Sequence, residues 1–254
     1  MNTKTPALEV SGLCKCYPAF ALRSASFSVP QGAVMGFIGR NGAGKSTTLK
    51  SLLGLVHPHG GQVRFFGKDF AANEQYIKEN IGVVLGGIDF YPKKKVKTIT
   101  EVTRRFYRCW DEEKYRHYLK LFSIDENKRV DQLSSGMRVK YLIALALSHD
   151  AKLLILDEPT SGLDPVSRDD LTALFSAVVA DGTRSILFST HITSDLEKCA
   201  THITYIRDGE ILCSAEKSAF LTAFDHLRQG EEQLTLEEIM VRSERRGYDE
   251  GIIV

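Results

Sequence analysis

A glycine-rich segment at residues 39–46 has the residue types and spacing of a phosphate-binding loop. It matches the pattern G-x-x-x-x-G-K-[ST], with the residues Gly39, Arg40, Asn41, Gly42, Ala43, Gly44, Lys45 and Ser46, followed by Thr47. Glycines let backbone N–H groups turn inward, and the N-terminus of a following helix adds partial positive charge, so the main chain can hold a polyphosphate. Lys45 can bind the outer phosphates, and the Ser46 hydroxyl can bind Mg²⁺.

Two adjacent carboxylates, Asp157 and Glu158, follow an aliphatic run at residues 153–156. Such a run predicts a buried strand that ends at these two acids. Asp157 can bind Mg²⁺ through water, and Glu158 can orient or deprotonate an attacking water molecule. Acids at strand ends are often only solvated, but the phosphate loop favours a catalytic role for this pair.

His191 follows a third apolar run, at residues 186–190. The end of a strand is where open α/β sheets bind their ligands. His191 is therefore a candidate sensor of a γ-phosphate, although a lone histidine is more often structural.

The elements that must position these residues alternate between short apolar runs and helical patterns, which is typical of an α/β fold. Strands are predicted at residues 7–10, 25–29, 34–38, 62–66, 81–85, 153–156, 185–189 and 203–206. A helix should run from Gly44 to about Leu53, and Asp208-Gly209 should close a hairpin. Polar and aromatic residues at helical spacing from 90 to 132 predict an inserted helical subdomain. We expect a P-loop NTPase core with a mostly parallel sheet, antiparallel β elements and this α-helical insertion.

The composition limits the classes of protein to which the chain can belong. Hydrophobic residues make up 43% of the 254 residues and charged residues 26%, which is typical of a globular protein, and the net charge of +1 gives no overall field for nucleic acid. The five cysteines lack paired spacing, so free thiols are expected; a metal site of Cys14, Cys16, His57 and His59 is the weaker reading. Apolar runs are shorter than the roughly 18 residues of a spanning helix, and no signal peptide opens the chain, so the cytosol is expected.

The order of motifs over about residues 7–213 resembles that of the ATP-binding cassette (ABC) family, in particular the separate ATPase subunits of transporters. Residues 133–137, which read L-S-S-G-M, are similar to the family signature L-S-G-G-Q and begin a helix before Asp157. Residues 161–164 resemble the D-loop, which ends at Asp164. His191 resembles the switch histidine, and Tyr17, 22 residues before Gly39, stands where the family places an aromatic ring against adenine.

The chain departs from the family pattern at two places. Ser135 and Met137 replace the usual glycine and glutamine of the signature. Gly86-Gly87 stand where the family has a glutamine after the strand at 81–85. In the family that glutamine contacts Mg²⁺ and couples the site to the permease, and this chain has no such side chain there. Similar departures, and the residues around Trp110, resemble the stand-alone ATPases of drug, bacteriocin and antimicrobial-peptide exporters.

The resemblance implies ATP hydrolysis with Mg²⁺, a second ABC ATPase subunit and an integral-membrane permease as partners. Ser134, Ser135, Gly136 and Asp164 would complete the nucleotide site of the facing subunit. It also implies a RecA-like core at 1–89 and 150–215, a helical signature subdomain at 90–149, a C-terminal extension at 216–254, and a cytoplasmic location on the inner face of the membrane. Two alternatives remain: a cassette ATPase acting on nucleic acid or ribosomes without a permease, and a regulatory nucleotide sensor.

The segment at 92–108 carries seven basic residues and one acidic residue, Glu101. A solvated helix face is the simpler interpretation. The alternative is contact with anionic lipid headgroups or with a cytoplasmic helix of the permease.

Overall fold

The computed structural model describes residues 5–85, 91–228 and 234–245. In this part of the chain a six-stranded sheet has the order β10-β9-β3-β8-β7-β6, and all neighbours except β9 and β10 are parallel. Its strands are β3 (Val34–Ile38), β6 (Ile81–Val84), β7 (Leu153–Asp157), β8 (Ser185–Thr190), β9 (His202–Arg207) and β10 (Glu210–Glu216). The residues of β3, β7 and β8 are all buried because both faces of the sheet are covered.

A second sheet is antiparallel, and its order is β2-β1-β4-β5 within the described residues. Its strands are β1 (Leu8–Tyr17), β2 (Phe20–Val29), β4 (Gly60–Phe65) and β5 (Lys68–Asp69). The first two are much longer than predicted. In β1 the register shifts between Val10 and Leu13, where Gly12 has a φ of 62°. A bulge there continues a strand that the glycine seemed to end in the sequence.

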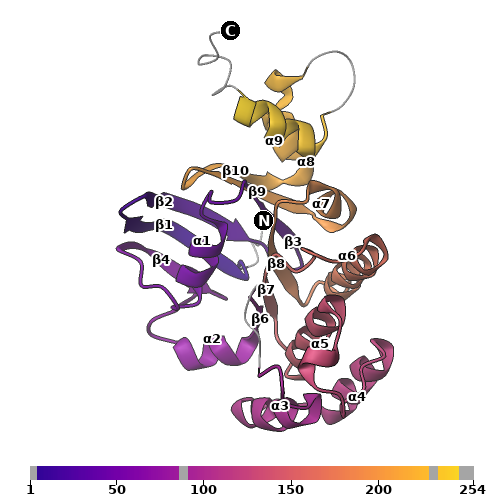
Figure 1. Cartoon of the computed structure of the whole chain (residues 1–254). Coiled ribbons are helices and arrows are strands. Elements are labelled where there is room, and N and C mark those ends of the chain that lie inside the picture. Colours follow the sequence, from indigo (N-terminus) through magenta and orange to yellow (C-terminus); the bar gives the residue numbers. More distant parts are fainter. Residues whose placement is uncertain (1–4, 86–90, 229–233, 246–254) are drawn as a thin grey trace.

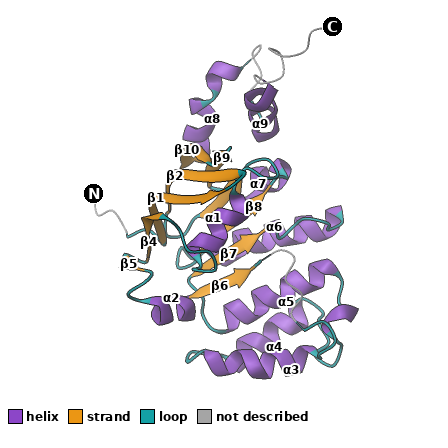
Figure 2. Cartoon of the chain, turned by 60° about the vertical axis from the view of Figure 1, so that its left-hand side comes forward, coloured by secondary structure: helices purple, strands orange, loops and turns teal. Residues whose placement is uncertain are grey.

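Helices cover both faces of the large sheet (Figures 1 and 2). They are α1 (Lys45–Leu52), α2 (Glu74–Asn80), α6 (Pro165–Val179), α7 (Thr193–Cys199), α8 (Lys217–Ala223), η3 (Asp225–Leu227) and α9 (Leu236–Arg245). The apolar side chains of α1 share a core with both sheets, whereas those of α6 to α9 pack on the opposite face of the large sheet. Helix α2 was not predicted, because only Ile77 on it is buried and it shows no apolar periodicity.

The helical insertion forms one end of the molecule in Figure 1. It contains α3 (Val96–Thr103), η1 (Arg104–Phe106), α4 (Glu112–Leu121), η2 (Val130–Gln132) and α5 (Ser135–Ser148). These elements have a hydrophobic cluster of their own. At its centre Thr100 Oγ1 hydrogen-bonds with the hydroxyls of Tyr115 at 2.7 Å and Tyr141 at 2.8 Å.

The fold class is confirmed: an α/β P-loop core carries a largely parallel sheet, antiparallel β elements and a helical insertion. The hairpin between β9 and β10 is also confirmed, and both turn residues, Asp208 and Gly209, have positive φ as such two-residue turns require. The domain boundaries stay a prediction. Among the described residues no helix is long and apolar enough to span a bilayer.

Candidate nucleotide site

The phosphate-binding loop joins β3 to α1, as its spacing predicts. Gly42 has a φ of 85° and Gly44 a φ of 112°, so both lie in the left-handed region that favours glycine. A Cβ atom on Gly44 would lie only 2.7 Å from the ring of Phe20. Within the described residues no side chain caps α1, so its first N–H groups are available to an anion.

Lys45 is the buried cation of this loop, with only 6% of its surface exposed. Its Nζ atom donates to the carbonyl oxygens of Gly39 at 2.8 Å and Arg40 at 3.3 Å. The same atom lies 3.4 Å from Oε1 of Glu158. A buried ammonium group needs such partners, and phosphate oxygens are acceptors that can take their place.

Asp157 and Glu158 leave the end of β7 in different directions, as two separate roles require. Ser189, on the neighbouring strand β8, donates from Oγ to Oδ1 of Asp157 at 2.5 Å. The backbone N–H of Glu158 donates to the carbonyl and to Oγ of Ser189, each at 3.1 Å. Glu158 has a φ of 49°, outside the strand region. Its side chain turns into the cavity, while Asp157 stays buried against β8.

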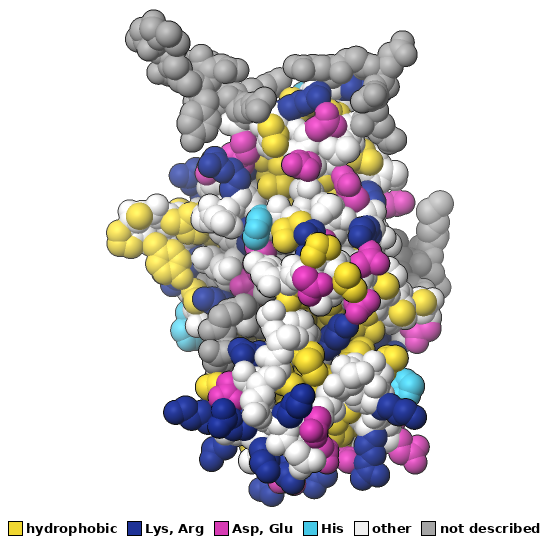
Figure 3. Space-filling view, turned by 45° about the vertical axis from the view of Figure 1, so that its right-hand side comes forward, with side chains coloured by type: hydrophobic (Ala, Val, Ile, Leu, Met, Phe, Trp, Pro, Cys, Tyr) yellow, Lys and Arg dark blue, Asp and Glu magenta, His cyan; other side chains and the backbone are white. Residues whose placement is uncertain are grey.

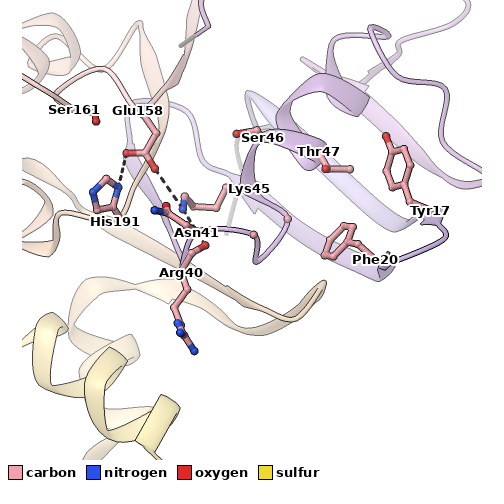
Figure 4. A pocket seen from close by; sticks show the side chains of 12 residues that line it. Tyr17, Phe20, Arg40, Asn41, Lys45, Ser46, Thr47, Glu158, Ser161 and His191 are labelled. Atoms are coloured by element: carbon pink, nitrogen blue, oxygen red, sulfur yellow. Dashed lines mark hydrogen bonds and ion pairs between the residues drawn. The ribbon is translucent and has the colours of Figure 1, made fainter. Parts of the chain in front are cut away.

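His191 follows the end of β8 and faces Glu158 across the site. Its Nδ1 atom lies 2.9 Å from Oε2 of Glu158. Figure 4 shows the imidazole, this carboxylate and the Lys45 ammonium group in one row, linked by their two contacts. The structure thus brings together residues from three separate segments of the sequence.

A cavity of about 570 Å³ contains these groups, a size typical of small-ligand sites. Its lining residues are Tyr17, Phe20, Arg40, Asn41, Gly42, Gly44, Lys45, Ser46, Thr47, Glu158, Ser161 and His191. Figure 4 shows two aromatic rings, from Tyr17 and Phe20, at the end of the cavity away from Glu158. The cavity therefore pairs an aromatic end with a charged end, which suits a base attached to phosphates.

Arg40 lies in the loop, but its side chain points away from Lys45 (Figure 4). Its Nη1 atom is 3.1 Å from Oε2 of Glu244 on α9, and the other oxygen of Glu244 accepts from the Tyr205 hydroxyl at 3.3 Å. Helix α9 thus contacts the phosphate loop, and no sequence motif predicted this contact.

The signature residues lie elsewhere on the chain and do not line this cavity. Ser134 caps α5 by accepting from the N–H of Met137 at 3.2 Å, and Ser135 next to it is exposed. Gly136 is buried, and a Cβ atom there would lie 3.5 Å from Ser167.

Asp164 caps α6 close to the signature. It accepts from the N–H groups of Val166 and Ser167, each at 3.0 Å, and from the Ser167 hydroxyl at 2.6 Å. These bonds, the hydroxyl of Ser167 first, lower the pKa of the Asp164 carboxyl group. The starts of α5 and α6 therefore lie next to each other, and Ser134, Ser135, Gly136 and Asp164 do not line the cavity.

Two site residues, Phe20 and Ser189, were not predicted, and Ser161 was predicted only as part of the D-loop segment. Phe20 could have been found from its position three residues after Tyr17 on the same hairpin. Ser161 lies in the D-loop segment, which the resemblance covers. Ser189 becomes recognisable only when β7 and β8 are paired. The Gly86-Gly87 departure lies outside the described residues.

Two metal sites were considered from the sequence: Mg²⁺ at Ser46 and Asp157, and an ion held by cysteines and histidines. Among the described residues no group of three or more His, Cys, Asp and Glu side chains could hold an ion by itself. One hydroxyl, from Ser46, and one carboxylate, from Asp157, fit Mg²⁺, which takes few protein ligands besides phosphates and water. All five cysteines are free thiols, and His59 Nδ1 accepts from the backbone N–H of Cys16.

A mostly parallel sheet, a P-loop and a strand ending in two carboxylates define a P-loop nucleotide-binding protein. Residues 22–161 match the family described as ABC transporter. The chain belongs to this family. The ATP-binding protein NatA of Bacillus subtilis is 32% identical over 198 residues, which cover 76% of this chain and 80% of that protein.

Two relatives named for transport are similar over a smaller share of their own length. The bacitracin transport ATP-binding protein BcrA of Bacillus licheniformis is 33% identical over 80% of this chain, and the Nod factor export ATP-binding protein I of Burkholderia orbicola is 33% identical over 77%. The matched region spans only 65% and 66% of these two proteins.

A solved ATP-binding subunit of an ABC transporter superposes with a TM-score of 0.80 at 26% identity, covering 92% of this chain and 98% of that chain. A dimeric ATP-binding cassette bound to ADP and Pi has the same fold, with a TM-score of 0.72 at 20% identity, covering 82% of this chain and 98% of that chain.

Proposed function

We propose that this chain hydrolyses ATP and drives a separate membrane permease that exports drugs or peptides. The observation that carries the proposal is the meeting of Lys45, Glu158 and His191 in one cavity. The names of the relatives, for bacitracin transport and Nod factor export, support an exporter. No relative reported above is named for an action on nucleic acid, the alternative that the sequence left open.

The cavity binds MgATP with its two ends. Tyr17 and Phe20 pack against the base, and the N–H groups of the loop from Gly39 to Thr47 hold the phosphates. Lys45 exchanges its carbonyl partners for outer phosphate oxygens. Ser46 and Asp157 hold Mg²⁺, and Ser189 fixes the orientation of the Asp157 carboxylate. The ion offsets negative charge on the phosphates.

Glu158 is the general base of the reaction. It takes a proton from water, and the oxygen of that water bonds to the γ-phosphorus while the bond to ADP breaks, which gives ADP and inorganic phosphate. His191 binds the γ-phosphate and keeps the Glu158 side chain in place through the 2.9 Å contact. The left-handed backbone of Glu158 aims its carboxylate into the cavity.

A second cassette completes each site. Ser134, Ser135 and the first N–H groups of α5 face the γ-phosphate bound by the partner subunit, and Asp164 lies beside them at the start of α6. None of these residues lines the cavity of its own chain, which supports this arrangement. Closure of the two subunits on ATP and opening after hydrolysis then drive the permease.

The permease binds in an apolar groove of about 410 Å³ between the core and the helical insertion. Its lining residues are Leu53, Leu55, Phe70, Lys78, Ile81, Val83, Leu85, Tyr107 and Leu142. Leu55 in this groove is 61% exposed, so its apolar side chain is accessible to a partner. An amphipathic helix of the permease fits a groove of this kind. Through it the chain is held on the inner face of the membrane.

The experiment measures ATPase activity of the chain alone and with its co-expressed permease. We expect stimulation by the permease that Leu55→Arg abolishes while basal activity is kept. Leu121→Arg is the matched control, because Leu121 on α4 is 58% exposed and lies outside the groove. Equal stimulation of the parent, Leu55→Arg and Leu121→Arg would contradict the assignment of this groove as the permease-binding site. Activity that no permease alters would favour the regulatory sensor.

A further inference from the structure

Helix α3 and the residues around it carry many exposed cations. Six of them have no ion-pair partner in the described ranges: Lys93, Lys94, Lys95, Lys97, Arg105 and Lys128. All six are exposed. Two other cations nearby do have partners, since Arg104 lies 3.7 Å from Glu112 and Arg108 lies 3.3 Å from Glu79.

Most of these cations lie on α3 or directly next to it in the chain. Val96, Ile99 and Thr100 are the buried residues of this helix. Lys97 and Glu101 lie on its exposed surface, and further exposed cations stand just before the helix, at residues 93–95, and just after it, at Arg105. Figure 3 shows basic side chains concentrated at the end of the molecule that the helical insertion forms. We call the exposed residues Lys93, Lys94, Lys95, Lys97 and Arg105 the basic face.

Several acidic groups lie near the basic face, and some of them are paired with other cations: Glu112 with Arg104, Glu79 with Arg108 and Glu74 with Lys78. Glu101 lies on α3 itself. The segment at 125–131 runs beside residues 94–97, since Val96 donates to the carbonyl of Lys128 and Lys97 to that of Glu126. It adds three acids, Asp125, Glu126 and Asp131, and Asp131 is paired with Arg129 at 2.9 Å. The basic face keeps an excess of positive charge.

Large apolar side chains border these cations. Phe106 is 73% exposed directly after Arg105, and Tyr91 is 70% exposed just before Lys93. Val102 on the solvent side of α3 is 52% exposed. Cations interleaved with exposed aromatic rings suit an anionic bilayer surface, because the headgroups attract the charges and the interface accepts the rings.

The position of the basic face also fits a membrane. Phe106 and Tyr107 line a cavity together with Lys78, and Tyr107 and Lys78 belong to the permease groove as well. Phe106 directly follows Arg105, so one end of the basic face lies next to the cavity that adjoins the groove where the permease is placed under the proposed function. A permease in the bilayer, bound in that groove, brings α3 toward the lipid headgroups.

We propose that the basic face of α3 binds anionic lipid headgroups of the membrane in which the permease lies. The proposal rests on the proposed function for the presence of a permease, but the lipid contact needs only this chain. A protein segment with acidic side chains is the competing occupant. Binding of such a segment would explain the cations but not the exposed aromatic rings on both sides of them.

The test is co-sedimentation of the full chain with vesicles of phosphatidylglycerol and phosphatidylcholine, against vesicles of phosphatidylcholine alone. We expect binding only to the anionic vesicles and weaker binding as salt rises. Lys93→Glu with Lys97→Glu should lower the affinity by about 30-fold or more, because each cation lost contributes about fivefold. Glutamate near the start of α3 favours the helix, so the fold is kept.

Two controls match these variants. Lys152→Glu with Lys198→Glu makes the same change in net charge at exposed residues outside the helical insertion, of which Lys198 is paired with Asp169 at 2.6 Å, and should leave vesicle binding nearly unchanged. Phe106→Ser should weaken binding, whereas Val166→Ser, at a residue 72% exposed on α6, should not.

Equal binding of the parent and the Lys93/Lys97 variant, or equal losses in the variant and its control, would overturn the proposal. Loss of permease stimulation with unchanged vesicle binding would assign the basic face to a protein segment instead. Basal ATPase activity is read in parallel, since its absence with intact vesicle binding counts against the proposed function and not against the lipid contact.

Discussion

The Nδ1 atom of His191 lies 2.9 Å from Oε2 of Glu158. The other carboxylate oxygen of Glu158 faces Lys45 at 3.4 Å. The Glu158 side chain therefore contacts both the ammonium group of Lys45 in the loop and the ring of His191. Changes at Glu158 should separate the binding of nucleotide from its hydrolysis.

Replacing Glu158 with Gln should slow ATP hydrolysis by about 10² to 10⁴-fold, because the amide keeps the shape and loses the base. Nucleotide binding should be kept, since the change removes a negative charge near the phosphates. The slowed site should hold two chains together in MgATP, which size-exclusion chromatography detects. Glu210→Gln, at a surface residue paired with Arg23, is the control. Normal turnover of the Glu158 variant would remove this residue from catalysis.

Replacing Lys45 with Ala should weaken MgATP binding by more than about 100-fold. The buried ammonium group can make two charge-assisted bonds to phosphates, each worth about 1.5 to 3 kcal/mol. Nucleotide titration measures the loss. Lys50→Ala changes an exposed lysine in the last turn of the same helix and should bind as the parent does. Equal affinity of both variants would contradict the phosphate-loop assignment.

Replacing Ser189 with Ala should raise the Mg²⁺ concentration needed for half-maximal ATPase activity by about 10 to 100-fold, as is typical when a residue that orients a metal ligand is lost. The cause is the lost 2.5 Å bond to Asp157. Ser185→Ala is a matched control at the opposite end of β8, where the hydroxyl donates to the carbonyl of Pro30. If both variants need the same Mg²⁺ concentration, Ser189 does not position Asp157.

The sequence was sufficient for the parts of the site that are local in the chain. The loop and the two acids at the end of β7 are contiguous motifs, so the sequence alone predicted where they lie relative to β3, α1 and β7. The contacts of Ser189 with Asp157 and of Arg40 with Glu244 join residues 32 and 204 positions apart. Such pairs depend on which strands are neighbours and where α9 packs, and no periodicity encodes this.

The same limit explains the elements that were missed or shortened. Helix α2 buries a single residue, Ile77, so apolar periodicity could not reveal it. Strand β1 continues through a bulge at Gly12, which in sequence looks like a break. Buried parallel strands such as β3 were predicted well, because burial on both faces requires an unbroken apolar run.

Stability should fall in mild acid because of His149. Its ring is 3% exposed and stacks on Tyr107 at 3.6 Å between centroids, and burial lowers its pKa to about 4. The neutral form is favoured in the folded state, so this contribution is present above pH 6.5 and is lost as pH falls toward 4. Between pH 7 and pH 5 the free energy of unfolding should drop by about 2 kcal/mol from this group.

Denaturant titrations at pH 7 and pH 5 measure the drop. His149→Gln should be less stable at pH 7 but should lose less on acidification than the parent. His117→Gln, at an exposed residue of α4, should keep the full pH dependence. An unchanged slope in the His149 variant would mean that other groups cause the acid sensitivity.

Mixing two inactive variants tests whether each site is shared between two chains. Ser135 is exposed at the start of α5, so Ser135→Asp keeps the fold and places a carboxylate against the phosphates of the partner's site. Gly136 is less suitable, because it is buried against Ser167. In a homodimer, Lys45→Ala alone and Ser135→Asp alone each damage both sites.

A mixed dimer of Lys45→Ala and Ser135→Asp carries both lesions in one site and leaves the other intact. ATPase activity should therefore return only on mixing, to at most about half of the parent level per mixed dimer, provided that one site can turn over alone. Ser135→Asn, which adds no charge, is the control and should keep most of its activity without mixing. Subunit exchange is verified by labelling the two chains. If exchange occurs and activity does not return, the sites lie within single chains or act only as a pair, or the natural partner is a different cassette.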